Sequence, residues 1–143
     1  MIANVLGVIN ILLSSKSKRK EVVAFLDELH KLLESDDFVI DTDLILISKE
    51  KQGDNQKFST PYTLLELDYD TEDVINRLKE LKTEEYSETK IDKDDMNPPL
   101  LFVFGKDISG KLVYVKLKIR GQQKKVVCVS FHYAKEKMEF PYA

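Results

Sequence analysis

The residues best suited to chemistry are His132, Tyr114 and Lys116, all in the last third of the chain. An imidazole titrates near neutrality and can accept a proton, a phenol can donate one, and an ammonium group can hold a phosphate. Cleavage of RNA through its own 2′-hydroxyl needs a base, an acid and cations that stabilise the charge on the phosphorane, and it needs no metal. These residue types suffice for that reaction. The alternative is a solvated sheet face without a catalytic role.

Two predicted strands place these side chains, because 112–119 and 126–132 each alternate apolar and polar residues. If the apolar side chains of both strands are buried together, the register is fixed, since a slip of one residue would expose all of them. Odd-numbered residues of both strands then face the core, and even-numbered residues form a polar face. On that face Tyr114 lies opposite His132, with Lys116 beside them.

Four further residues are candidate RNA contacts around this polar face. Lys118 shares the face by alternation, and Arg120 lies at its rim. Lys106 adds a cation for phosphate, and Phe104 adds an aromatic ring on which a base of a single strand can stack. The segment that carries Phe104 is apolar on both faces, so the pattern leaves its register open.

The first part of the chain has helical periodicity. Apolar residues at helical spacing predict a helix over 18–34, capped by Ser17, and a second over 71–81, with Thr71 as its N-cap. His30 falls off the apolar stripe of the first helix and is expected to be exposed. The segments between the helices are predicted as a strand over 38–47 and a polar loop over 48–60.

A short apolar run over 100–104 precedes the two alternating strands, and turn residues separate all three. Three consecutive antiparallel strands form a meander. Helices followed by strands are typical of the α+β class, so we expect N-terminal helices packed on a small C-terminal antiparallel sheet.

The length of 143 residues and a hydrophobic content of 43% predict one α+β domain over 1–143 with a real core. No apolar run reaches the roughly 18 residues that span a bilayer. Ile2 to Leu13 has helical spacing, and residues 1–14 are interpreted as an extra apolar helix or an oligomerisation segment. This segment lacks the features of a signal peptide, so we expect a cytoplasmic protein.

Cysteine and histidine usage argues against a metal or cofactor. The single cysteine, Cys128, cannot form an internal disulfide and is expected to pack as a small apolar side chain, and no His/Cys cluster has zinc-ligand spacing. Charge is unevenly distributed, because residues 66–96 carry a net charge of −7 and residues 97–143 one of +6, within a total of −3. This polarity favours a basic face for an anionic ligand and an acidic face for a basic partner, with plain surface charge as the alternative.

Several short motifs follow one another in the second half of the chain. They are Leu67-Asp68-Tyr69-Asp70, Thr83-Glu84-Glu85-Tyr86, Phe102-Val103-Phe104-Gly105-Lys106, the strand 113–118, Val129-Ser130-Phe131-His132 and Phe140-Pro141-Tyr142. Together, over roughly residues 62–143, they resemble the MqsR-like toxins of bacterial type II toxin–antitoxin modules.

This resemblance implies a RelE-like fold and sequence-selective cleavage of mRNA that a cognate antitoxin, with a helix-turn-helix domain, suppresses. The family's sheet tyrosine falls on Tyr114, and the basic residue after its last Ser-Phe falls on His132. Two positions depart from the family pattern, because Ser87 replaces a lysine after Tyr86 and no glutamine occurs within 101–104.

Two further explanations remain open at the level of sequence. The scaffold can serve as a non-catalytic protein- or RNA-binding module, in which the acidic band 66–96 and the basic sheet face meet partners. The apolar segment 2–13 can also make the chain a homo-oligomer with a scaffolding role.

Overall fold

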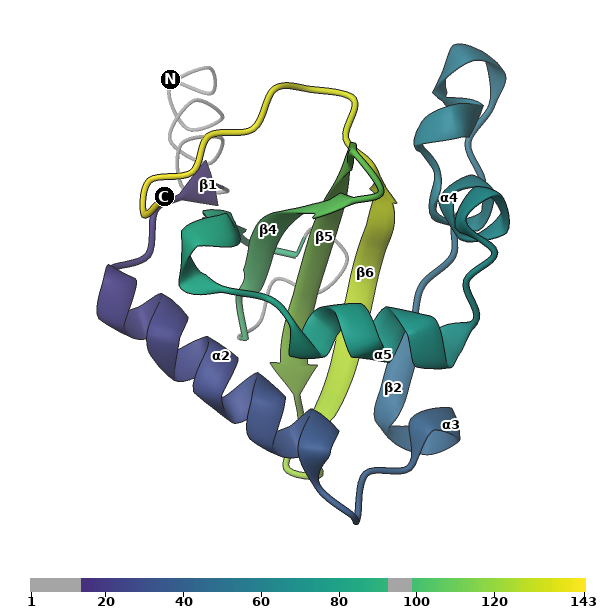
Figure 1. Cartoon of the computed structure of the whole chain (residues 1–143). Helices are drawn as coiled ribbons and strands as arrows, with labels where there is room; N and C mark the ends of the chain where they lie inside the picture. The colour runs from purple at the N-terminus through teal and green to yellow at the C-terminus, as the bar shows by residue number, and fades with distance from the viewer. Residues whose placement is uncertain (1–13, 93–98) are drawn as a thin grey trace, which may run out of the picture.

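A computed structural model describes residues 14–92 and 99–143, which form a six-stranded sheet with helices on one face (Figure 1). The strand order is β1-β3-β4-β5-β6-β2, and every pairing is antiparallel except that of β2 with β6. The strands are β1 (Ser14–Ser15), β2 (Leu44–Leu46), β3 (Tyr86–Lys90), β4 (Leu101–Ile108), β5 (Lys111–Arg120) and β6 (Lys125–Tyr133). The predicted α+β class is confirmed.

Helices α2 and α5 lie across one face of the sheet in Figure 1. The helical elements are α2 (Arg19–Glu34), α3 (Ile40–Asp43), the 3-10 helix η1 (Gly53–Phe58), α4 (Thr60–Leu67), α5 (Thr71–Lys79) and the 3-10 turn η2 (Thr83–Glu85). The apolar stripes of α2 and α5 pack on β5 and β6 in one hydrophobic core. Burial of each large apolar side chain there stabilises the fold by roughly 1.5–3 kcal/mol.

The register predicted for β5 and β6 is confirmed where the polar residues lie, because Tyr114 pairs with His132. Beyond Lys116 the register shifts by one residue and leaves Val129 without a partner on β5. This β-bulge reverses the alternation of β6, so Cys128 is buried in the core although its even number predicted the polar face. Cys128 packs as a small apolar side chain, as expected.

The predicted strands differ from the structure on both sides of the sheet. Strand β3 lies in the acidic segment before Pro98-Pro99 and was not predicted, and a bulge at Ser87 interrupts its alternation. The strand predicted over 38–47 is wrong in part, because Ile40–Asp43 forms a helical turn and only Leu44–Leu46 is extended. The carboxylate of Asp43 accepts the Val39 N–H at 2.8 Å and holds that turn.

The loop predicted over 48–60 contains η1, and it leads into a helix, α4, that was not predicted. Thr60 and Thr63 of α4 accept the backbone N–H groups of Phe131 and Tyr133 at 3.1 and 3.0 Å. These hydroxyls accept hydrogen bonds from the part of β6 that has no partner on β2. Helix α4 therefore covers this part of the sheet edge.

The capping residues of both predicted helices differ from expectation by one position. Lys18 is the N-cap of α2 and its N–H donates to Glu21 at 2.8 Å, whereas the Ser17 hydroxyl bonds to Thr89. Asp70, not Thr71, caps α5 through a reciprocal pair with Asp73.

His30 on α2 is also not exposed as predicted. It is half-buried, and its Nε2 has no hydrogen-bond partner among the described residues. The predicted helix over 2–13, with its suggested role in oligomerisation, lies outside the described residues. Within the described ranges, no helix has the length and apolar character needed to span a bilayer.

Candidate functional site

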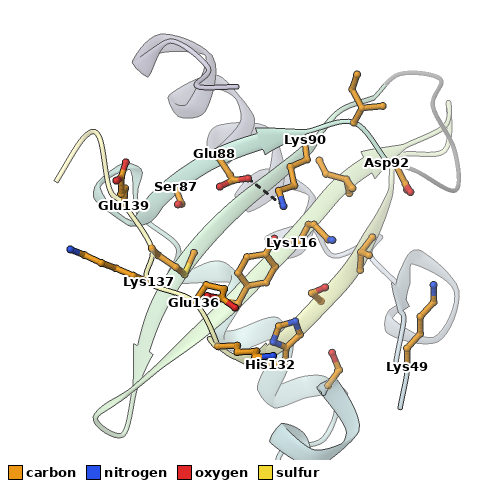
Figure 2. A pocket seen from close by; sticks show the side chains of 18 of the residues that line it. Lys49, Ser87, Glu88, Lys90, Asp92, Lys116, His132, Glu136, Lys137 and Glu139 are labelled. Atoms are coloured by element: carbon orange, nitrogen blue, oxygen red, sulfur yellow. Dashed lines mark ion pairs between the residues drawn. The ribbon is translucent and has the colours of Figure 1, made fainter. Parts of the chain in front are cut away.

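A cavity of about 740 Å³ opens on the sheet face turned away from α2 and α5 (Figure 2). Side chains of β3, β5 and β6 form its floor. Its walls come from Lys49 and Lys51, which follow β2, and from residues 135–139. These residues belong to the segment 134–143, which we call the C-terminal strap. Both β-bulges of the sheet border this cavity, because Ser87 and Val129 line it.

Tyr114 and His132 stack on each other on the cavity floor. Their ring centroids are 5.2 Å apart and their planes are inclined by 13°. The Lys116 Nζ lies 5.9 Å from the centroid of the Tyr114 ring. The structure therefore brings together all three residues proposed from sequence as the catalytic group, and all three line the cavity.

The position of His132 fixes which ring nitrogen can accept a proton. Its Nδ1 lies 2.9 Å from the carbonyl oxygen of Tyr133, and a carbonyl can only accept, so Nδ1 carries the hydrogen. Nε2 of the neutral ring is then a free acceptor. Burial lowers the pKa of His132, and the charges of Lys51 and Lys116 lower it further. The imidazole is therefore neutral at pH 7, as a general base must be.

The pKa of Tyr114 shifts in the opposite direction to that of His132. Burial raises the pKa of its phenol, while the nearby Lys90 ammonium partly opposes that rise. The hydroxyl therefore stays protonated at neutral pH and can donate a proton or a hydrogen bond. A neutral base and a protonated acid thus lie side by side.

Lys90 of β3 belongs to the site and was missed from sequence. Burial lowers the pKa of Lys90, but interactions with Tyr114 and Glu88 outweigh that effect, so its pKa is raised overall. Its Nζ lies 3.4 Å from the Glu88 carboxylate, and Figure 2 shows it pointing into the cavity near Lys116. The sequence signal was weak because the bulge at Ser87 breaks the alternation of β3.

The cavity is lined mainly by cations. Seven lysines and His132 face four carboxylates: the lysines are Lys16, Lys49, Lys51, Lys90, Lys116, Lys135 and Lys137, and the acids are Glu88, Asp92, Glu136 and Glu139. This surplus of positive charge in a concave surface favours an anionic ligand, although the whole chain is acidic.

Phe104 and Lys106 do not share the face of Tyr114, so their predicted placement is wrong. Phe104 pairs with Val115 and is fully buried in the core. Lys106 pairs with Val113, also on the helix-covered face, and its Nζ lies 3.2 Å from the Glu85 carboxylate. The part of β4 that contains Phe104 is apolar on both faces. Only its pairing with β5 decides which of its side chains face the core.

Lys118 and Arg120 also depart from their expected roles. Lys118 lies on the face of Lys116 but is only 1% exposed and forms an ion pair of 3.0 Å with Asp92. Lys118 does not line the cavity. Arg120 is exposed at the far end of β5, six residues or about 20 Å from Tyr114.

The C-terminal strap crosses from the end of β6 to the region of β1 (Figure 1). The Tyr142 hydroxyl donates to the carbonyl of Ser17, and its ring stacks on Tyr86 with centroids 5.8 Å apart. The Phe140 ring lies directly over Gly105, where an added Cβ would come within 2.7 Å of it. A side chain at this position would therefore force the Phe140 ring to move.

The arrangement can transfer protons and hold an anion. Among the residues of ranges 14–92 and 99–143, no group of three or more His, Cys, Asp or Glu side chains is placed to hold a metal ion. Comparisons of the chain with protein-family models, with curated proteins and with solved structures found no match.

Proposed function

We propose that the chain is an endoribonuclease that binds single-stranded RNA in this cavity and cleaves it through the 2′-hydroxyl without a metal. The observation that carries the proposal is the stacked pair of Tyr114 and His132, with Nδ1 of the imidazole held by a backbone carbonyl and Nε2 left free. The surrounding lysines supply the positive charge that a phosphodiester requires.

In the proposed reaction Nε2 of His132 takes the proton of the 2′-hydroxyl, and the 2′-oxygen attacks phosphorus. Lys116 and Lys90 stabilise the phosphorane. The bond from phosphorus to the 5′-oxygen then breaks, and the Tyr114 hydroxyl protonates that oxygen. The products are a 2′,3′-cyclic phosphate and a 5′-hydroxyl. Proton transfers by positioned groups contribute about 10²- to 10⁴-fold in rate.

For the biological role, we propose an mRNA-cleaving toxin of a type II toxin–antitoxin module that acts in the cytoplasm. The support is the resemblance of residues 62–143 to MqsR-like toxins. On the same basis we propose a cognate antitoxin with a helix-turn-helix domain. A small helix-turn-helix reading frame beside the gene, whose product restores growth on co-expression, is the expected result. Growth inhibition that no neighbouring product relieves would contradict the role.

The second candidate is a non-catalytic protein- or RNA-binding module. The observation that favours it is the presence of four carboxylates in the cavity, including Glu88 beside Lys90, because a site that only neutralises phosphate does not need them. A mixed set of charges also suits a polypeptide ligand with charges of both signs.

Incubation of the purified chain with single-stranded RNA in EDTA distinguishes these functions. Specific scission supports the nuclease, whereas intact RNA with a gel shift supports the binding module. Lys116→Ala is expected to weaken RNA binding. Arg120→Ala on the same strand is the matched control and is expected to behave as wild type, because Arg120 is exposed outside the cavity. Equal effects of both substitutions would contradict the assignment of the cavity.

A further inference from the structure

A second cavity, of about 340 Å³, lies on α4 near the end of β6 from which the C-terminal strap leaves. It is lined by three aromatic rings, two lysines, one carboxylate and two small apolar groups: Phe58, Tyr62, Tyr133, Lys57, Lys111, Glu66, Leu112 and Ala134. None of these residues belongs to the group proposed for catalysis.

The aromatic rings of this cavity differ in accessibility. Tyr133 is only 8% exposed and forms its inner wall, whereas Tyr62 is 37% exposed and forms its rim. A flat ring at the rim of a slot can stack on a nucleobase, because every base presents a π face. One turn further along α4, Leu65 is 83% exposed but does not line the cavity.

The single carboxylate of the cavity is fully engaged by its neighbours. Glu66 accepts hydrogen bonds of 2.8 Å from both the Tyr133 hydroxyl and the Lys111 ammonium. The hydrogen bond from Lys111 is the main cause that lowers the pKa of Glu66, so it stays ionised and paired. Its negative charge is largely neutralised, and Lys57, 5.5 Å from the centroid of the Phe58 ring, leaves the rim cationic.

The ridge between the two cavities consists of η1, which carries one carboxylate, Asp54, and one lysine, Lys57, and is flanked by further lysines. Lys51 of the main cavity donates to the Phe58 carbonyl at the end of η1 at 2.8 Å. Lys135 of the C-terminal strap donates to Asn55 of the same ridge at 2.6 Å. Lysines therefore stand on the main-cavity side of this ridge, and Lys57 on the aromatic side, as a phosphate backbone crossing it would require.

We infer that RNA held in the main cavity continues over η1 and stacks a further nucleobase on Tyr62. The occupant is a flanking nucleotide of the same single strand, and charge complementarity along the ridge is the argument for it. The inference rests on the proposed function and adds to it a substrate longer than the nucleotides at the scissile bond, so binding is expected to strengthen with length.

The test uses 2′-O-methyl oligonucleotides, which lack the attacking hydroxyl and therefore report binding without cleavage. A trinucleotide and a decanucleotide are titrated against wild type, Tyr62→Ala, Tyr62→Phe and Leu65→Ala. We expect Tyr62→Ala to weaken decanucleotide binding about 5- to 100-fold and to leave trinucleotide binding unchanged. Tyr62→Phe keeps the ring, and Leu65→Ala alters an exposed apolar residue outside the cavity, so both are expected to bind as wild type.

Each alternative result has one meaning. If Tyr62→Ala binds the decanucleotide with the same affinity as wild type, the stacking site is overturned while the proposed function stands. Equal losses with Leu65→Ala, or equal losses at both lengths, also overturn it. If wild type binds neither oligonucleotide, the proposed function itself fails, and the stacking site fails with it.

Discussion

The two faces of this sheet are built from alternate residues of the same strands, yet different forces determine them. On the helix-covered face, Val113, Val115 and Phe131 are fully buried by α2 and α5, and the hydrophobic effect fixes their positions. On the cavity face, their sequence neighbours Tyr114 and His132 are polar and half-buried. The positions of the candidate catalytic residues are therefore determined by the packing of the opposite face.

The separation of core and cavity is not complete, and the exceptions are informative. Lys118 lies on the cavity face but is buried and paired with Asp92, and His30 on α2 is polar but has a buried Nε2. Both exceptions place a polar atom in a buried position. Substitutions on each face, including these two residues, can therefore be compared by their effects on the free energy of unfolding and on RNA cleavage.

The largest expected effect is on activity and comes from His132→Ala. Loss of the general base is expected to lower RNA cleavage by about 10²- to 10⁴-fold and to abolish growth inhibition on expression. Thermal unfolding should change little, because His132 is outside the hydrophobic core. Full cleavage and toxicity in this variant would remove His132 from the mechanism.

The adjacent substitution Phe131→Ala tests the other face of the same strand. A cavity in the core is expected to lower the free energy of unfolding by about 3–5 kcal/mol, as measured by denaturant titration. At temperatures where the variant remains folded, RNA binding in the main cavity should persist. A stability loss below that of His132→Ala would contradict the assignment of the two faces.

The buried ion pair on the cavity face gives the next effect. Asp92→Asn removes a carboxylate that pairs with the buried Lys118 ammonium, and we expect a destabilisation of about 3 kcal/mol. Lys118→Met removes that charge and should cost less, and the double variant should be more stable than Asp92→Asn alone. Additive losses in this double-mutant cycle would show that the two side chains act independently.

The pH dependence of cleavage follows from the two pKa shifts. His132 must be deprotonated to act as a base, and burial lowers its pKa below the usual 6.5, so the rate should fall about tenfold per pH unit only below that value. Tyr114 must be protonated, and its pKa is raised above the usual 10, so the alkaline limb should lie above pH 10. A steady-state rate profile with an acidic midpoint above 6.5 would contradict the role of His132.

The smallest expected effect concerns His30. Its Nε2 is buried with no hydrogen-bond partner in ranges 14–92 and 99–143, so His30→Leu should raise the free energy of unfolding by about 1 kcal/mol and leave cleavage unchanged. A loss of stability measured by thermal unfolding would show that the ring makes a polar contact essential to the fold.

The sequence was sufficient for the α+β class and for the pairing of Tyr114 with His132, because strong alternation in β5 and β6 permits only one buried arrangement. It was not sufficient for β3 and for part of β6, since bulges at Ser87 and Val129 break the alternation of inward and outward side chains. These bulges border the cavity, so the regions that are hardest to predict are those next to the candidate site.

The sequence pattern also could not predict which lysines line the cavity. Lys118 and Lys116 have the same place in the alternation, and only the position of Asp92 in three dimensions decides that Lys118 is buried in an ion pair. Phe104 was misplaced because its strand is apolar on both sides. Lys90 enters the site through a strand that was not predicted.

The most direct test of cleavage by the 2′-hydroxyl compares one RNA with its all-2′-deoxy counterpart in EDTA, with mass analysis of the product ends. We expect that the RNA is cut, that its new ends carry a 2′,3′-cyclic phosphate, and that the DNA is bound but stays intact. Cleavage of both strands alike, or RNA that stays intact with correctly folded protein, would contradict this mechanism.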